Sequence, residues 1–67
     1  MKVKANDKFS TVFGADDFIR HWPELLSTGI EVRKCGDLYY IIEDGKVLHD
    51  SAFFTERELN DCLTILD

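Results

Sequence analysis

The sequence lacks the short motifs that are associated with nucleotide, zinc or nucleophile sites. It contains no GxGxxG, GxxxxGK[ST], HExxH or GxSxG segment, so phosphate loops, helical zinc sites and nucleophile elbows have no support. Its two cysteines, Cys35 and Cys62, are far apart and match neither a CxxC pair nor a zinc spacing. We therefore predict a protein that is not an enzyme, holds no cofactor or metal ion, and keeps both thiols reduced.

Positive charge is also scarce. The chain has 13 Asp and Glu against 8 Lys and Arg, for a formal net charge of −5. Nucleic acids are bound mainly through clustered Lys and Arg, and the local basic excess is limited to Lys2, Lys4 and Lys8. We expect these three to form a solvated edge. A basic protein partner would instead be attracted by the negative charge.

Long hydrophobic runs and linkers are absent as well. No stretch of 18 apolar residues occurs, and the N-terminus has no apolar segment of signal-peptide length. These absences predict a cytoplasmic protein that does not associate with membranes. Because 67 residues without a Pro/Gly/Ser-rich linker support one small core, residues 1–67 are predicted to form a single domain.

The C-terminal segment contains a helix signal. Thr55 and Glu58 are spaced as a capping box, in which the Thr hydroxyl accepts from the amide of Glu58 and the Glu carboxylate accepts from that of Thr55. Phe54 and Leu59 flank the cap as a hydrophobic staple. Apolar residues then continue at helical spacing as far as Leu66. The pattern predicts a helix over residues 56–66.

The middle of the chain has the pattern of a β-meander. Residues 30–35 alternate in polarity, residues 38–42 are rich in aromatic and β-branched side chains, and residues 46–49 are expected to return beside them. Asp44-Gly45 is a strong signal for a type I′ hairpin turn. The central strand is apolar on both faces, so either a partner covers one face or some aromatic surface is exposed.

The first third combines a helix with strand-like residues. Apolar residues keep helical spacing from residue 15 to residue 26, but Pro23 predicts a helix that ends near Trp22 and restarts with Pro23 as its first residue. Residues 9–13 alternate like a strand that ends at Gly14, and residues 2–5 are expected to pair with them.

Together these elements predict an α+β fold. We expect a small two-layer domain in which an antiparallel β-meander of 3–4 strands carries two helices packed on one face, in the order β(β)-α-β-β-β-α. This arrangement hosts many functions. Function therefore has to be argued from particular side chains.

Histidines and acidic pairs give no catalytic arrangement. His21 and His49 are the only imidazoles, and His49-Asp50-Ser51 is the one segment with the composition of a triad. Consecutive side chains point in different directions, so this segment is interpreted as a strand end followed by a polar loop. Asp16-Asp17 and Glu43-Asp44 do not have the alternating oxygen ligands of a calcium loop and suit a helix start and a turn.

The candidate functional feature is collective. Acidic residues recur along the whole chain between aromatic residues, and aromatic anchors inside a charged rim are typical of protein interfaces. The competing interpretation is that the aromatic residues form the core and the acids solubilise the surface. The residues predicted to bind a partner are Trp22, Tyr39, Glu43, Asp44 and Phe53.

The function predicted from these features is binding of another macromolecule. We expect a small, acidic, non-catalytic module of the accessory, adaptor or inhibitor type that binds a larger, basic protein, with DNA mimicry as the sharpest version. One alternative is a structural homodimer, since domains this small gain from assembly. Another is a weak nucleic-acid binder that uses Tyr39 and the basic residues Lys2, Lys4, Lys8, Arg33 and Lys34.

Overall fold

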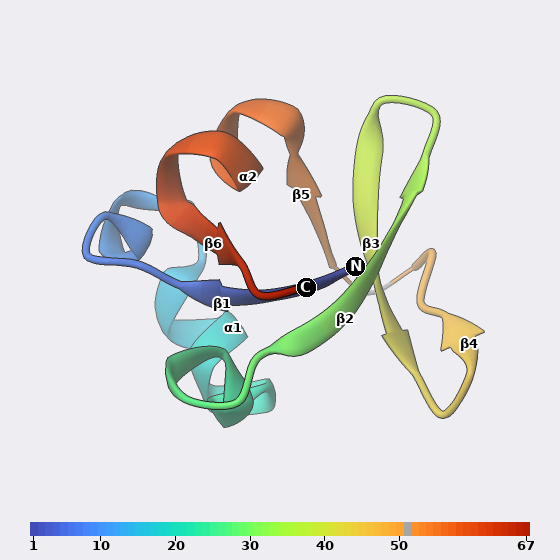
Figure 1. Ribbon diagram of the computed structural model, residues 1–67, viewed down its shortest axis with the longest axis horizontal. Coiled ribbons are helices and arrows are strands. Elements are labelled where there is room, and N and C mark those ends of the chain that lie inside the picture. The colour runs from blue at the N-terminus through green and yellow to red at the C-terminus, as the bar shows by residue number, and fades with distance from the viewer. Residues whose placement is uncertain (51) are drawn as a thin grey trace.

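The computed structural model describes residues 1–50 and 52–67 and has an α+β fold (Figure 1). The strands are β1 (Lys2–Ala5), β2 (Ile30–Cys35), β3 (Leu38–Glu43), β4 (Lys46–Val47), β5 (Phe53–Thr55) and β6 (Leu63–Ile65). The α-helices are α1 (Ala15–His21) and α2 (Glu56–Cys62), and the 3-10 helices are η1 (Phe9–Thr11) and η2 (Pro23–Leu26). The predicted fold class is confirmed, but this part of the chain forms a sheet of six strands rather than three or four.

The sheet is antiparallel and strongly curved. Its order is β4-β3-β2-β1-β6, and β5 pairs with β3 next to β4. Helix α2 follows β5 directly and leads directly into β6, as Figure 1 shows. It connects strands that pair at different places in the sheet, β5 with β3 and β6 with β1. The two ends of the chain meet at the β1–β6 pair, where the amide of Leu66 donates to the carbonyl of Lys2.

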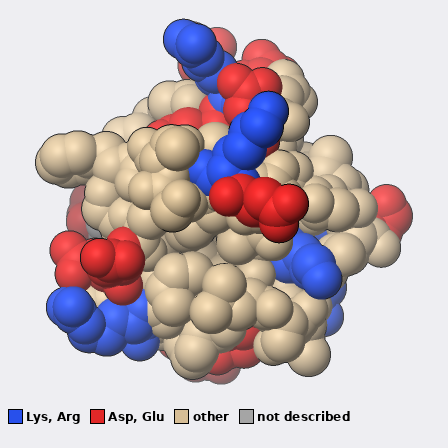
Figure 2. Space-filling view, turned by 90° about the vertical axis from the view of Figure 1, so that its left-hand side faces the viewer, with Lys and Arg blue, Asp and Glu red and all other residues tan. Residues whose placement is uncertain are grey.

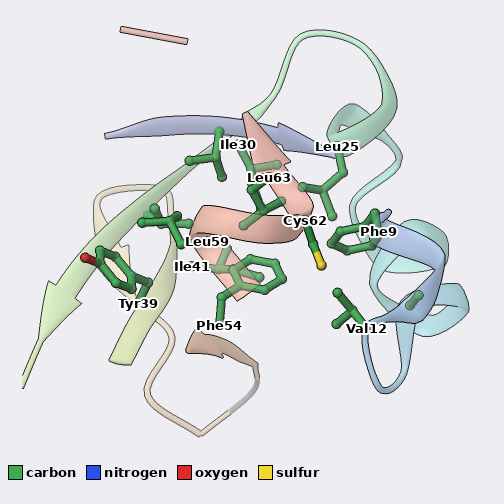
Figure 3. Close-up of a cluster of buried hydrophobic side chains, with 13 residues drawn as sticks. Phe9, Val12, Leu25, Ile30, Tyr39, Ile41, Phe54, Leu59, Cys62 and Leu63 are labelled. Carbon is green, nitrogen blue, oxygen red and sulfur yellow. The ribbon is translucent and has the colours of Figure 1, made fainter. Parts of the chain in front are cut away.

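The core fills the space between the curved sheet and the helices. Figure 3 shows buried side chains from α2, β3, β5 and η1 converging there. Phe54 of β5 is completely buried and packs edge-on against Phe9, with ring centroids 6.1 Å apart. The other buried hydrophobic residues are Val3, Val12, Ala15, Leu25, Ile30, Val32, Tyr39, Ile41, Leu59, Cys62 and Leu63.

The C-terminal helix is shorter than predicted. The capping box is confirmed, because the Thr55 hydroxyl accepts from the amide of Glu58 and the Glu58 carboxylate accepts from the amide of Thr55. The helix ends at Cys62, however, and residues 63–65 form β6, so the prediction of helix to residue 66 is wrong. Thr64 and Ile65 are β-branched and favour strands. Their pairing with β1 gives their backbone groups hydrogen-bond partners, which the last carbonyls of a longer helix would lack.

The segment before α1 also differs from its prediction. Residues 9–13 were expected to form a strand that pairs with residues 2–5, but they contain η1, and β1 pairs with β2 and β6 instead. A 3-10 turn brings residues three apart to the same side, which buries both Phe9 and Val12. Phe13, which a continued strand would have turned inward with Phe9, is left 96% exposed.

The predicted turns are confirmed. Asp44 and Gly45 both have positive φ, at 53° and 78°, as a type I′ turn requires. The returning strand β4 is limited to two residues rather than four, because the chain turns at His49, whose amide donates to the carbonyl of Val47. Helix α1 ends at His21, and Pro23 is the first residue of η2.

Candidate functional site

A groove of about 900 Å³ lies beside α1 in the described part of the chain. Its walls come from the η1–α1 turn, α1, the end of β3, the segment before β5, β5 itself and the start of α2. We call it the aromatic groove. Its lining residues are Phe13, Gly14, Asp17, Phe18, His21, Trp22, Glu43, Leu48, Ala52, Phe53, Thr55 and Glu58.

One wall of the groove is continuous with the core. Phe18 and Trp22 are four residues apart, and their ring centroids lie 6.0 Å from each other. The Phe18 ring also stacks on buried Phe54, with centroids 4.7 Å apart and an interplanar angle of 25°. Residues at i and i+4 lie on the same face of a helix. The contact between Phe18 and Phe54, which holds α1 on the core, therefore also positions the Phe18 and Trp22 rings in the groove.

The other aromatic side chains of the groove are exposed. Phe13 is 96% exposed and Phe53 47% exposed. Gly14, with φ of 76°, turns the chain between Phe13 and α1. Phe53 lies opposite Tyr40 in the β3–β5 pair, with ring centroids 6.0 Å apart. A single exposed apolar residue is ordinary, but here two exposed rings line the same hollow as two rings anchored to the core.

Three carboxylates, Asp17, Glu43 and Glu58, line the groove, and no Lys or Arg does among the residues described. We call these three the acidic rim. Asp17 pairs with Arg20 at 3.0 Å, but both side chains are 71% exposed and such a pair is weak. Glu58 Oε1 accepts from the amide and the hydroxyl of Thr55.

Glu43 differs from the other two acids. It is exposed at the end of β3, and within residues 1–50 and 52–67 it forms no ion pair. The only imidazole of the groove, His21, is held by a 2.9 Å contact between its Nδ1 and the backbone oxygen of Asp17. The groove therefore combines an aromatic surface with an excess of negative charge.

The structure brings together three of the five residues that the sequence predicted for partner binding. Trp22, Glu43 and Phe53 all line the groove. Asp44 is exposed in the β3–β4 turn outside it. Tyr39 belongs to the core at 5% exposure, and its hydroxyl donates to Glu56 at 3.4 Å.

Several groove residues were not predicted. Phe13 was missed because residues 9–13 looked like a strand, although the Gly that follows it was a signal for a turn. Phe18 and His21 were identified as helix residues, but nothing in the sequence shows that the end of β3 lies opposite them. Leu48 and Ala52 flank His49-Asp50-Ser51 in the sequence, which was interpreted as a strand end and a polar loop with no role in binding.

The other residues considered for metal or catalytic chemistry are His49, Cys35 and Cys62. No group of three His, Cys, Asp or Glu side chains among the described residues is placed to hold a metal ion. His49 packs against Tyr40, with ring centroids 4.9 Å apart, and Ser51 of the His49-Asp50-Ser51 segment lies outside the described residues. Cys35 and Cys62 are free, the first half-buried and the second buried.

The charged residues of the surface are mixed. Figure 2 shows the side of the molecule that carries α1 and η1, where acidic and basic side chains lie next to one another around a broad area of other residues. Ion pairs join Arg20 to Asp17, Arg57 to Asp61 and the N-terminal amine to Glu31. None of the helices described has the length and apolar character needed to cross a membrane.

Comparison with known proteins provides no relative. No protein-family model, curated protein or solved structure matches this chain. The groove is therefore the feature of this chain from which a function can be inferred.

Proposed function

We propose that this protein is a small, non-catalytic binding module whose aromatic groove receives a segment of a larger partner protein. The observation that supports the proposal is that Phe13 and Phe53 are exposed in the same hollow as Trp22, with carboxylates around them. Accessory, adaptor and inhibitor proteins work by such contacts alone. The cytoplasm stays the predicted location.

The composition of the groove suits a protein partner. Interfaces concentrate binding energy in aromatic residues that become buried within a polar or charged rim. Covering one Phe side chain removes apolar surface from water and contributes roughly 1.5–3 kcal/mol before the costs of association. The groove offers several such side chains together, and Phe18 and Trp22 are already ordered by contacts to the core or to each other.

Two other versions of the predicted function have less support than binding in the groove. DNA mimicry needs carboxylates gathered on one surface, and on the face drawn in Figure 2 acidic and basic side chains lie next to one another. A nucleic-acid reader would offer Tyr39 for base stacking, but the Tyr39 ring is buried.

The structural homodimer remains the second candidate because the groove contains both a projecting side chain and a hollow. Phe13 of one copy could enter the groove of another in a two-fold arrangement. The acidic rims would then approach each other, which is unfavourable at low salt. This difference in salt dependence separates the two candidates.

The proposal is tested by affinity capture with the tagged protein and two variants. Phe13→Ala removes an exposed ring from the groove, and the control Leu26→Ala removes an exposed side chain elsewhere, at 62% exposure. We expect a stoichiometric partner to be captured by the wild type and by Leu26→Ala, but not by Phe13→Ala. Equal capture by all three proteins would contradict a role for the groove.

A further inference from the structure

We infer that the partner segment presents a lysine or arginine to Glu43 beside a bulky apolar side chain that packs against Trp22 and Phe18. The inference rests on the proposed function, because it names the chemistry of what enters the aromatic groove. It assigns Glu43 as the residue that selects the partner.

The charge of the groove is the first argument. Its lining contains Asp17, Glu43 and Glu58 and no described Lys or Arg. An acidic segment would therefore add like charge, and a neutral one would bring no cation to Glu43 as water is excluded. Opposite charge attracts a partner and suppresses unsuitable ones. A cationic segment is therefore the occupant that the groove favours.

Among the three acids of the groove, Glu43 is the one best placed to bind a cation from the partner. The Glu58 carboxylate holds the start of α2 through Thr55, and the Asp17 carboxylate faces Arg20. Glu43 stands at the end of β3, where Lys46 lies opposite it across the hairpin. Among the residues described, the two side chains form no ion pair. A cation that enters the groove can pair with Glu43 without breaking an ion pair of the described residues.

The aromatic wall explains the apolar part of the occupant. The indole of Trp22 is the ring type that attracts cations most strongly, and the methylene stem of Lys or Arg packs on apolar surfaces while its charged end stays near water or a carboxylate. Phe18 of α1 and Leu48, from the segment before β5, add apolar lining. A neighbouring Leu, Phe or Met in the partner would bury these surfaces, which a lone cation would leave exposed.

The test uses a displayed library of random peptides selected on the immobilised protein at low salt. Bound peptides are screened again on Phe13→Ala to retain those that depend on the groove, and the retained sequences are synthesised. Binding is followed by the fluorescence of Trp22, the only tryptophan in the chain. We expect the retained peptides to share Lys or Arg next to a large apolar residue.

Two matched variants then test the role of Glu43. Glu43→Gln removes the carboxylate in the groove, whereas Asp44→Asn removes the neighbouring carboxylate outside it, at a positive φ that Asn adopts readily. We expect Glu43→Gln, or replacement of the peptide's basic residue by Gln, to weaken binding about tenfold. Asp44→Asn should bind as the wild type does.

The outcomes separate this inference from the proposed function. Retained peptides that lack basic residues, or equal binding by Glu43→Gln and the wild type, would overturn the inference while leaving the groove as a binding site. If no peptide depended on Phe13, both the inference and the proposed function would fail.

Discussion

The buried and the exposed aromatic residues of this protein differ in position rather than in type. Phe53 and Phe54 are neighbours on β5, yet Phe54 is completely buried and Phe53 is 47% exposed. Side chains of a strand alternate between its two faces, so one residue supports the core and the next lines the groove. Aromatic content alone therefore predicts neither role. The face of β5 on which an aromatic side chain lies determines whether it stabilises the core or lines the groove.

The core and the groove are joined through α1. Phe18 touches Phe54 on one side and Trp22 on the other, and both Phe18 and Trp22 line the groove. The groove is therefore built on a wall that the core holds in place. Variants that change only the core or only the groove can separate effects on stability from effects on binding.

The largest expected effect is on the core side of β5. Phe54→Ala removes a fully buried ring that contacts Phe9 and Phe18, and such a cavity costs about 3–5 kcal/mol. A domain of this size has little stability to spare, so we expect the variant to be largely unfolded. Circular dichroism during urea unfolding measures this. A loss below about 1 kcal/mol would show that Phe54 is not central to the core.

The next effect is expected at the start of α2, between the core and the groove. Thr55→Ala removes the hydroxyl that accepts from the amide of Glu58, and loss of such a cap costs about 1 kcal/mol. Thr55→Ser keeps the hydroxyl and serves as the control. Urea unfolding should rank the wild type close to Thr55→Ser and both above Thr55→Ala, and equal stability of the Ser and Ala variants would contradict the role of the cap.

On the groove side of β5, stability and binding should separate. Phe53→Ala loses the cross-strand contact with Tyr40, which is worth less than about 1 kcal/mol, so the protein should stay folded. We expect its unfolding midpoint to change little while its capture of the partner is lost. If Phe53→Ala lost as much stability as Phe54→Ala, the two faces of β5 would not differ in their contributions to stability and binding.

The smallest effect is expected outside both regions, at the β1–β6 pair. The amide of Lys2 donates to the Asp67 carboxylate at 3.0 Å, and this hydrogen bond lowers the pKa of Asp67 below its ordinary value of 3.8. Because the folded pKa is the lower one, the ionised carboxylate favours the fold above pH 3.8, and this contribution is lost as pH falls through the folded pKa.

Asp67→Asn should therefore lower the melting temperature slightly near neutral pH and leave it unchanged in strong acid. Thermal unfolding followed by circular dichroism at both pH values measures the difference. A difference that grows toward acid would contradict the assigned direction of the pKa change.

The sequence predicted those parts of the fold that local interactions determine. The capping box at Thr55, the turn at Asp44-Gly45 and the break at Pro23 are each set by a few adjacent residues, and all three are confirmed. The α+β class followed from these elements. Trp22, Glu43 and Phe53 were identified as site candidates from composition, and the structure places them in one groove.

The remaining features depend on contacts between distant parts of the chain. Residues 63–65 have an apolar pattern compatible with a helix, and their pairing with β1, which is nearly the whole chain away, makes them a strand. Tyr39 and Tyr40 point to opposite faces of β3, and Tyr39 is the buried one because its face packs toward distant elements such as α2, where its hydroxyl donates to Glu56. The position of Phe13 depends on η1, whose alternating sequence resembled a strand.

The claim that the aromatic groove binds the partner is tested most directly by mapping the contact on the protein itself. Two-dimensional nitrogen–proton NMR spectra of the isotope-labelled protein, recorded as the captured partner or a selected peptide is added, report which backbone amides and which indole change. We predict changes around Phe13, Trp22, Glu43 and Phe53. Changes confined to exposed residues outside the groove, such as Leu26 and Ile65, with an unchanged Trp22 indole signal, would contradict binding in the groove.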